Sequence, residues 1–374
     1  MQLSKIAMAG ALFTGSLHAA DASTTEALSL LNNYNLITSA DLGTASEVEG
    51  NALIGGNLYG NSNYHIKAGT STAVSALTVA GDIVGNVNVN GPGLNVGGNI
   101  AGSVNMNGGG NAYVGSVSGN LNNNANGNGS TYVVGDISGT VGTNGGNTVY
   151  GGQLTGNASA NGSGTVQHQS VTPPFNPATQ VANAISTLSS FSDQLSNLVA
   201  NSSYSFSGNK AIFNAVGNSD GLAVFSIGDA NSFFSQAGEF EFNFANNAQR
   251  VLFNVTNSNP AGVLYINANF LADAANQWGS KFLWNFENAT SISIGAQFGG
   301  TILATGADVG NSANIEGTLV AHYVLQAAEI HSRPLDAGFA SAIPAAVPVP
   351  GAAPLFLSAL AGLGALTRRT RNAA

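Results

Sequence analysis

A glycine pattern recurs along residues 77–167, and it constrains the fold more than any other feature of the chain. Each copy reads Gly-polar-apolar-x-Gly, and the first glycines of successive copies lie 17, 17, 20 and 17 residues apart. These glycines are Gly81, Gly98, Gly115, Gly135 and Gly152. Repetition at a nearly fixed period of this length indicates a solenoid, in which each copy packs mainly against its neighbours.

Within each copy, apolar and polar residues alternate, which is the pattern of a half-buried strand. We predict that three apolar columns point inward: the first has Ile83, Ile100, Val117, Ile137 and Leu154, the second Val79, Val96, Tyr113, Val133 and Tyr150, and the third Val87, Val104, Leu121, Val141 and Ala158. A polar ladder is predicted at one corner, formed by Asn86, Ser103, Asn120, Thr140 and Asn157. A strand that recurs once per coil predicts a parallel β-helix, with coils about 4.8 Å apart.

The period changes between residues 176 and 200, where apolar residues recur every three or four positions. Asn176 is a good N-cap and Pro177 suits the first turn, so this segment predicts an amphipathic helix. Strand patterns return between residues 204 and 330. The predicted fold is therefore all-β: a parallel β-helix (β-solenoid) over residues 23–340 with one amphipathic α-helix packed along its flank.

The two ends of the chain carry export signals. Residues 1–22 contain one charge, Lys5, then an apolar run and small residues, as in a secretory signal peptide. Residues 341–350 read as a linker and residues 351–374 as a transmembrane segment with a basic tail. Arg368, Arg369 and Arg371 would act as a stop-transfer signal, because basic residues beside a span stay on the cytoplasmic side. We therefore predict that the body of the protein is exported.

The charge balance narrows the range of partners. Between residues 21 and 347 there are 18 acidic and five basic residues, a net charge of −13. Such a surface repels nucleic acid, which we do not expect as a partner. The chain has no cysteine, so its fold depends on its core alone.

Short motifs spread over residues 25–340 resemble the choice-of-anchor A domains, which are adhesive domains with varied C-terminal anchors. The matching segments are 27–34, 46–50, 54–57, 283–286, 289–290, 300–304, 315–321 and 329–331. The resemblance implies an adhesive β-helix at the cell surface or in the extracellular matrix, with exopolysaccharide or a neighbouring cell surface as the partner.

The tail resembles a VPLPA/PEP-CTERM-type sorting signal, carried by Val347, Pro348, Val349 and Pro350. The resemblance implies processing by an exosortase-like protease of a Gram-negative bacterium. The protein would then be anchored in the inner membrane only transiently. Val349 and Gly351 depart from the commonest forms of the motif.

Few residues suggest chemistry. Glu329 and His331 lie two apart on a predicted strand and so share a face; they predict either an acid–base or metal site, or a structural pair that closes the last coil. Glu47 and Glu49 also share a face, but Ca²⁺ needs six to eight oxygens and the chain has no Asp-rich loop. We predict no cofactor, with Ca²⁺ as the alternative.

Three function classes follow from this sequence. A structural or adhesive surface protein is favoured, and no enzyme activity is predicted. An ice- or crystal-surface binder would need a regular threonine array, for which the only column is Thr131, Thr148 and Thr165. A β-helix polysaccharide-degrading enzyme would need clustered basic residues, but those of the body are scattered.

The sorting signal gives the first testable prediction. Deleting residues 354–371 should release a folded protein into the medium or periplasm, because the β-helix does not use these residues. Cell fractionation with a thermal melt of the released protein checks this, and retention of the truncated protein at the membrane contradicts it.

Overall fold

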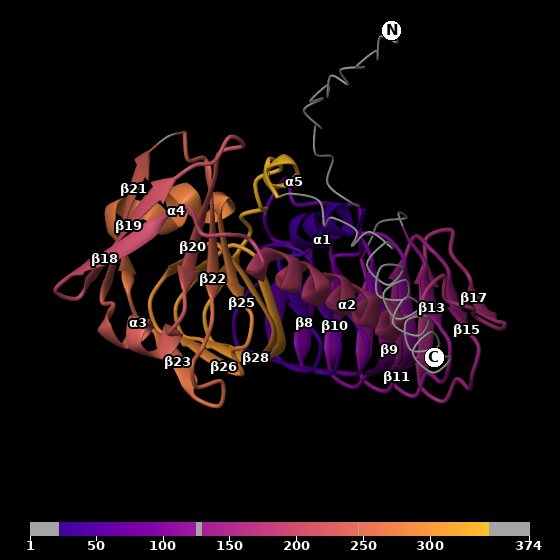
Figure 1. Cartoon of the computed structure of the whole chain (residues 1–374). Coiled ribbons are helices and arrows are strands. Elements are labelled where there is room, and N and C mark those ends of the chain that lie inside the picture. The colour runs from indigo at the N-terminus through magenta and orange to yellow at the C-terminus, as the bar shows by residue number, and fades with distance from the viewer. Residues whose placement is uncertain (1–21, 125–128, 246, 344–374) are drawn as a thin grey trace, which may run out of the picture.

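The computed structural model describes residues 22–124, 129–245 and 247–343, and strands make up most of its regular structure (Figure 1). The prediction of an all-β chain is confirmed. The sorting motif at residues 347–350, the three tail arginines and the signal peptide, apart from Ala22, lie outside the described residues. Among the helices that are described, none has the length and apolar character needed to cross a bilayer.

The 17-residue repeats stack as parallel coils, which we call the repeat arm (residues 52–168). Each repeat adds one strand to each of two rows: Asn86 pairs with Ser103, and Ser103 pairs with Asn120. One row contains β3 (Ala52–Ile54), β6 (Leu77–Val79), β9 (Leu94–Ile100), β11 (Ala112–Val117), β13 (Thr131–Val133), β15 (Thr148–Tyr150) and β17 (Val166–His168), beside the short β4 (Leu58–Gly60) and β7 (Ile83–Val84). The other contains β5 (Ser62–Tyr64), β8 (Asn86–Val89), β10 (Ser103–Met106), β12 (Asn120–Asn123), β14 (Thr140–Asn144) and β16 (Asn157–Asn161).

The first predicted inward column is buried except at the open end of the arm, where Leu154 is 38% exposed. In the second column Tyr113 was placed wrongly, because Val114 points inward and Tyr113 outward. The cause is a β-bulge: Val96 pairs with Val114 but Asn99 pairs with Ser116, so Gly97 and Gly98 face one residue. A strict 17-residue count misses this extra residue.

The C-terminal coils form a second arm (residues 203–331) with an aromatic core. Phe225 stacks on Phe253 at 5.2 Å, and Phe253 on Trp284 at 3.7 Å. Its strands are β18 (Ser203–Ser207), β19 (Lys210–Val216), β20 (Leu222–Ile227), β21 (Glu239–Ala245), β22 (Arg250–Val255), β23 (Val263–Ile266), β24 (Asn269–Phe270), β25 (Phe282–Phe286), β26 (Ser291–Ile294), β27 (Phe298–Gly299), β28 (Thr301–Asn311), β29 (Ile315–Glu316), β30 (Leu319–Gln326) and β31 (Ile330–His331). They pair in parallel, except that β18 and β19 are antiparallel.

The last coil of the chain lies in the middle of the stack, against the first. β1 (Leu36–Thr38) pairs on one side with β3 and on the other with β30, while β2 (Leu42–Thr44) also pairs with β30. We call the contact between residues 36–50 and 319–332 the seam, since it joins the two arms into one ladder. Glu329 and His331 lie on this last coil, as expected, but the coil is not the end of the stack, because coils continue on both sides of it.

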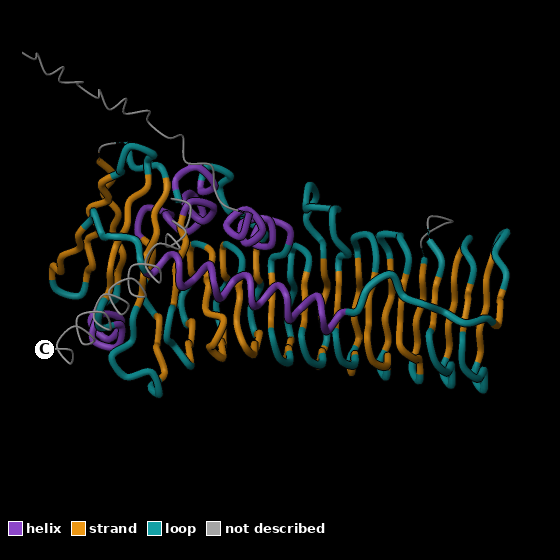
Figure 2. The backbone as a smooth tube through the Cα atoms, turned by 45° about the vertical axis from the view of Figure 1, so that its right-hand side comes forward, coloured by secondary structure: helices purple, strands orange, loops and turns teal. Residues whose placement is uncertain are grey.

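The predicted flanking helix is α2 (Pro177–Ser196), which carries the chain back from the end of the repeat arm across the seam (Figure 2). The Asn176 side chain accepts hydrogen bonds from the backbone N–H groups of Ala178 and Thr179, which caps the helix as predicted. Its buried residues pack on outward apolar side chains of both arms, including Leu53 and Leu303.

The prediction of a single helix was wrong. The structure also contains α1 (Ala22–Asn33), α3 (Ala230–Gln236), α4 (Ala274–Trp278) and α5 (Phe339–Ala342), with 3₁₀ turns at Leu271–Asp273 and Gly279–Lys281. α1 and α5 bury Leu31 and Phe339 in the same apolar cluster as α2. Helices this short give little periodic signal, and tertiary packing stabilises them.

A pair of variants on β12 tests the inward and outward faces. Leu121 is buried between Val104 and Val141, so Leu121→Asp should lower the free energy of unfolding by about 3 to 5 kcal/mol. Its neighbour Asn120 is exposed, so Asn120→Asp should change it by less than about 0.5 kcal/mol. Denaturant melts of both variants check this, and equal losses would refute the assigned faces.

Candidate functional site

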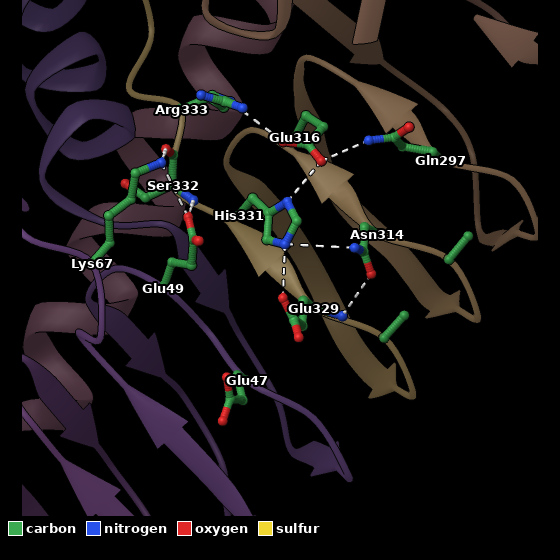
Figure 3. Close-up of polar contacts among 12 residues, drawn as sticks. Glu47, Glu49, Lys67, Gln297, Asn314, Glu316, Glu329, His331, Ser332 and Arg333 are labelled. Carbon is green, nitrogen blue, oxygen red and sulfur yellow. Dashed lines mark hydrogen bonds and ion pairs between the residues drawn. The ribbon is translucent and has the colours of Figure 1, made fainter. Parts of the chain in front are cut away.

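Glu329 and His331 lie on the outward face of the seam, where polar side chains from three neighbouring coils come together (Figure 3). Between them Ile330 points into the core, where it pairs with Ile315 on one side and Val48 on the other. The alternation of β-strand side chains therefore aligns three outward pairs: Asn314 and Glu316, Glu329 and His331, and Glu47 and Glu49.

The His331 imidazole is held between two carboxylates. Its Nδ1 lies 2.7 Å from Glu316 Oε1, and its Nε2 lies 2.8 Å from Glu329 Oε2. Glu316 is only 1% exposed, and it also contacts Arg333 Nε at 3.3 Å and Gln297 Nε2 at 2.8 Å. Glu316 thus has the charged and hydrogen-bonding partners that a buried carboxylate requires, whereas the Glu329 side chain is 44% exposed.

A second set of contacts crosses the seam directly. The backbone N–H of Ser332 donates to Glu49 Oε2 at 2.7 Å, and Lys67 Nζ donates to the Ser332 carbonyl at 2.7 Å. Lys67 and Glu49 form an ion pair at 3.2 Å. Glu47, next to the pair, accepts a hydrogen bond from Asn63. These contacts tie the first coil to the last.

Burial of the ring lowers the pKa of His331, but the hydrogen bonds to Glu329 and Glu316 and the charges of Glu316 and Glu49 outweigh it. The net pKa is raised above the ordinary value for histidine. The protonated ring is thereby favoured between its carboxylates. In the described part of the chain, no group of three or more His, Asp or Glu side chains is arranged to hold a metal ion. The predicted absence of a cofactor, with Ca²⁺ as the alternative, stays untested.

Beyond the seam, the outward face of the repeat arm carries hydrogen-bonded asparagine ladders, which the sequence reasoning missed. In one, Asn88 donates to Asn63 at 2.7 Å, Asn105 to Asn88 at 3.3 Å and Asn122 to Asn105 at 3.1 Å. In a second ladder, Asn107 donates to Asn90 at 3.1 Å. Further along the arm, Asn144 donates to Asn124 at 3.0 Å and Asn161 donates to Asn144 at 2.7 Å. We call the outward face of β5, β8, β10, β12, β14 and β16 the ladder surface.

The signal for these ladders was present in the sequence, since Asn88, Asn105 and Asn122 lie 17 residues apart. The predicted polar column lies two residues earlier, and among the described residues its side chains form no such chain of hydrogen bonds. The threonine column does not form the regular surface array that an ice- or crystal-surface binder would need, because Thr131 and Thr148 are fully buried and both contact Thr143.

A family model described as "Putative Ice-binding-like adhesive domain" matches residues 27–132 and 124–332, well over half of the chain. The chain belongs to this family. No curated protein matches the chain. A solved structure that it resembles is the Tapirin C-terminal domain of Caldicellulosiruptor kristjanssonii, at 13% identity, with 84% of this chain and 96% of that chain covered and a TM-score of 0.22.

The raised pKa of His331 predicts a pH-dependent stability of the adhesive domain. The stabilisation by protonated His331 should be fully present below the unfolded-state pKa of about 6.5, and it should be lost as the pH rises through the higher folded-state pKa. His331→Gln should therefore cost about 2 kcal/mol at about pH 5 and much less at about pH 9. Melting temperatures of both proteins across this range check the prediction.

His322→Gln is the matched control, because the His322–Asp308 pair is 53% and 56% exposed and solvent screens it. This variant should differ little from the wild type at any pH. A His331→Gln penalty that stays constant with pH would contradict the assignment.

Proposed function

We propose that this protein is an exported surface or matrix adhesin: a parallel β-solenoid that binds exopolysaccharide or a neighbouring cell surface through repeated weak contacts. Membership of an adhesive-domain family supports the adhesive role. The parallel pairing of strand after strand, with a nearly constant offset, supports the solenoid. We further propose that it is a choice-of-anchor A protein sorted by an exosortase-like protease in a Gram-negative bacterium, with Val347, Pro348, Val349 and Pro350 as the motif.

The observation that carries the adhesive role is the ladder surface. Within the first ladder the inner amides, Asn88 and Asn105, each use one N–H as a donor and the oxygen as an acceptor, so a second N–H and a lone pair remain for a ligand. The ladder also fixes the orientation of each amide, which lowers the entropy lost on binding. Identical groups repeated once per coil suit a repeating polymer, and their avidity grows with the number of coils.

We propose that the Glu329–His331 cluster is structural and that the protein has no turnover and no cofactor. His331 lies between two carboxylates, and Glu316 is already occupied by Arg333 and Gln297. The cluster adds ion pairs to the seam contacts beside it. Incubation of the protein with polysaccharides, with and without a Ca²⁺ chelator, tests this. Product formation that His331→Ala abolishes would instead indicate an enzyme.

Two variants test the adhesive role. Deleting residues 94–111 removes one coil and joins Gly93 to Ala112, the residue that pairs with Leu94. This protein should fold yet bind immobilised matrix polysaccharide more weakly. The triple variant Asn88→Ala, Asn105→Ala, Asn122→Ala should weaken binding about tenfold or more.

The control is the triple variant Asn86→Ala, Ser103→Ala, Asn120→Ala, which changes the same three strands two residues away and leaves the ladder intact. Biosensor binding curves measure all four proteins. Equal losses in both triple variants would show that the ladder is not the binding element.

A further inference from the structure

One column of outward side chains runs through both arms, and its chemistry changes where α2 begins. Under the helix the column is apolar, with Leu303, Val320, Ile37 and Leu53 in register. Near the N-terminal end of the helix it continues as Thr78 and Asn95, which lie on strands that the helix contacts and are buried, and then as Tyr113 and Tyr132. The helix thus covers the apolar part and reaches the two buried polar positions, and its N-terminal end lies beside the tyrosine part of the column (Figure 2).

Two adjoining hollows lie at this end of the helix. One of about 840 Å³ is lined by residues that include Gln180 and Asn183, and one of about 580 Å³ by residues that include Tyr113. Asn95, Phe175 and Asn176 line both hollows. We call the two together the helix-end groove.

The walls of the groove combine flat rings with amides. Tyr113 stacks on Tyr132 with the ring centres 4.8 Å apart and the planes 9° apart, so the two rings form one platform. Phe175 is 42% exposed although it is a large apolar side chain. Asn183 is exposed, and among the described residues its amide has no hydrogen-bond partner. Apolar walls with a few polar groups are the usual composition of a small-ligand site.

Charge decides between classes of ligand. None of the residues that line either hollow is acidic or basic. An anionic sugar or nucleotide would lose hydration there without gaining a cation, which is unfavourable. A neutral sugar suits both kinds of wall, because its hydroxyl groups can bond to amides and its apolar C–H face can cover an aromatic ring.

We propose that the helix-end groove is a binding site for a neutral oligosaccharide, in which one sugar ring lies against Phe175 and Tyr113 and the amide of Asn183 bonds to hydroxyl groups. This site is separate from the ladder surface, and it rests on the proposed function only for the general class of ligand. A groove that takes a few sugar units would recognise a particular glycan, whereas the ladder surface contacts any suitable repeating polymer.

Calorimetric titration of the full chain with neutral hexasaccharides (cellohexaose, mannohexaose and maltohexaose) tests the site, with a hexauronate as the charged counterpart. At least one neutral sugar should bind, and the hexauronate at least about tenfold more weakly. Phe175→Ala and Asn183→Ala should each weaken binding, Phe175→Ala by about tenfold. Tyr59→Ala is the matched control, because Tyr59 is also 42% exposed but does not line the groove, and it should bind as the wild type does.

Absence of binding to all three neutral sugars would overturn the inference, as would equal binding by wild type and Phe175→Ala. Tighter binding of the hexauronate would also overturn it. Thermal melts show whether each variant is folded at the titration temperature, and we expect Phe175→Ala to stay folded there because Phe175 is 42% exposed. If Phe175→Ala loses sugar binding but still adheres to matrix polysaccharide, the proposed adhesive function stands. If the wild type binds the sugar in the groove but does not adhere, the adhesive function is rejected and the groove site stands.

Discussion

Backbone pairing across the seam is the constraint on which the rest of the structure depends. A parallel coil exposes unpaired N–H and C=O groups on both edges, and each edge needs a neighbour or a cover. The first coil meets this need on one side with the next repeat and on the other with the last coil of the chain, through β1 and β30. Two stretches of coils that are separate in sequence thereby become one continuous ladder.

Several features follow from this closure. The chain must return from the far end of the repeat arm, and α2 does so while covering the apolar outward column of both arms. The carboxylate–histidine cluster lies where the two arms meet, next to Ser332, whose hydrogen bonds to Glu49 and Lys67 cross from one arm to the other. Buried hydrogen bonds at the seam, such as the one from Thr44 to Gln326 at 2.7 Å, also specify the register of the two coils, which apolar packing alone would specify less well.

Local patterns in the sequence predicted local structure well. The repeat predicted inward positions such as Ile83 and Ile100, and the cap at Asn176 predicted where α2 begins. The error at Tyr113 came from a bulge that adds one residue without changing the glycine spacing. The pairing of Glu329 with His331 needed only strand alternation.

The seam could not be predicted in this way. A strand of three residues such as Leu36–Thr38 carries no mark of which distant strand will pair with it. Glu316 lies 15 residues before His331, not 17, so its place in the same cluster was hidden from a search at the repeat period. Which distant strands pair depends on how all the coils stack, whereas the sequence shows only the local pattern of each segment.

The position of the described ends has a mechanical consequence. α1 and α5 pack together at the seam, so the chain enters and leaves at the middle of the rod (Figure 1). A tether attached after Ile343 would pull on the centre, and both arms would project sideways from the attachment point. Tension would first load the packing of α5 and the 2.5 Å ion pair between Arg250 and Asp336. The outermost coils, which pair with only one neighbouring coil each, would not carry this tension, so it would not separate them from the stack.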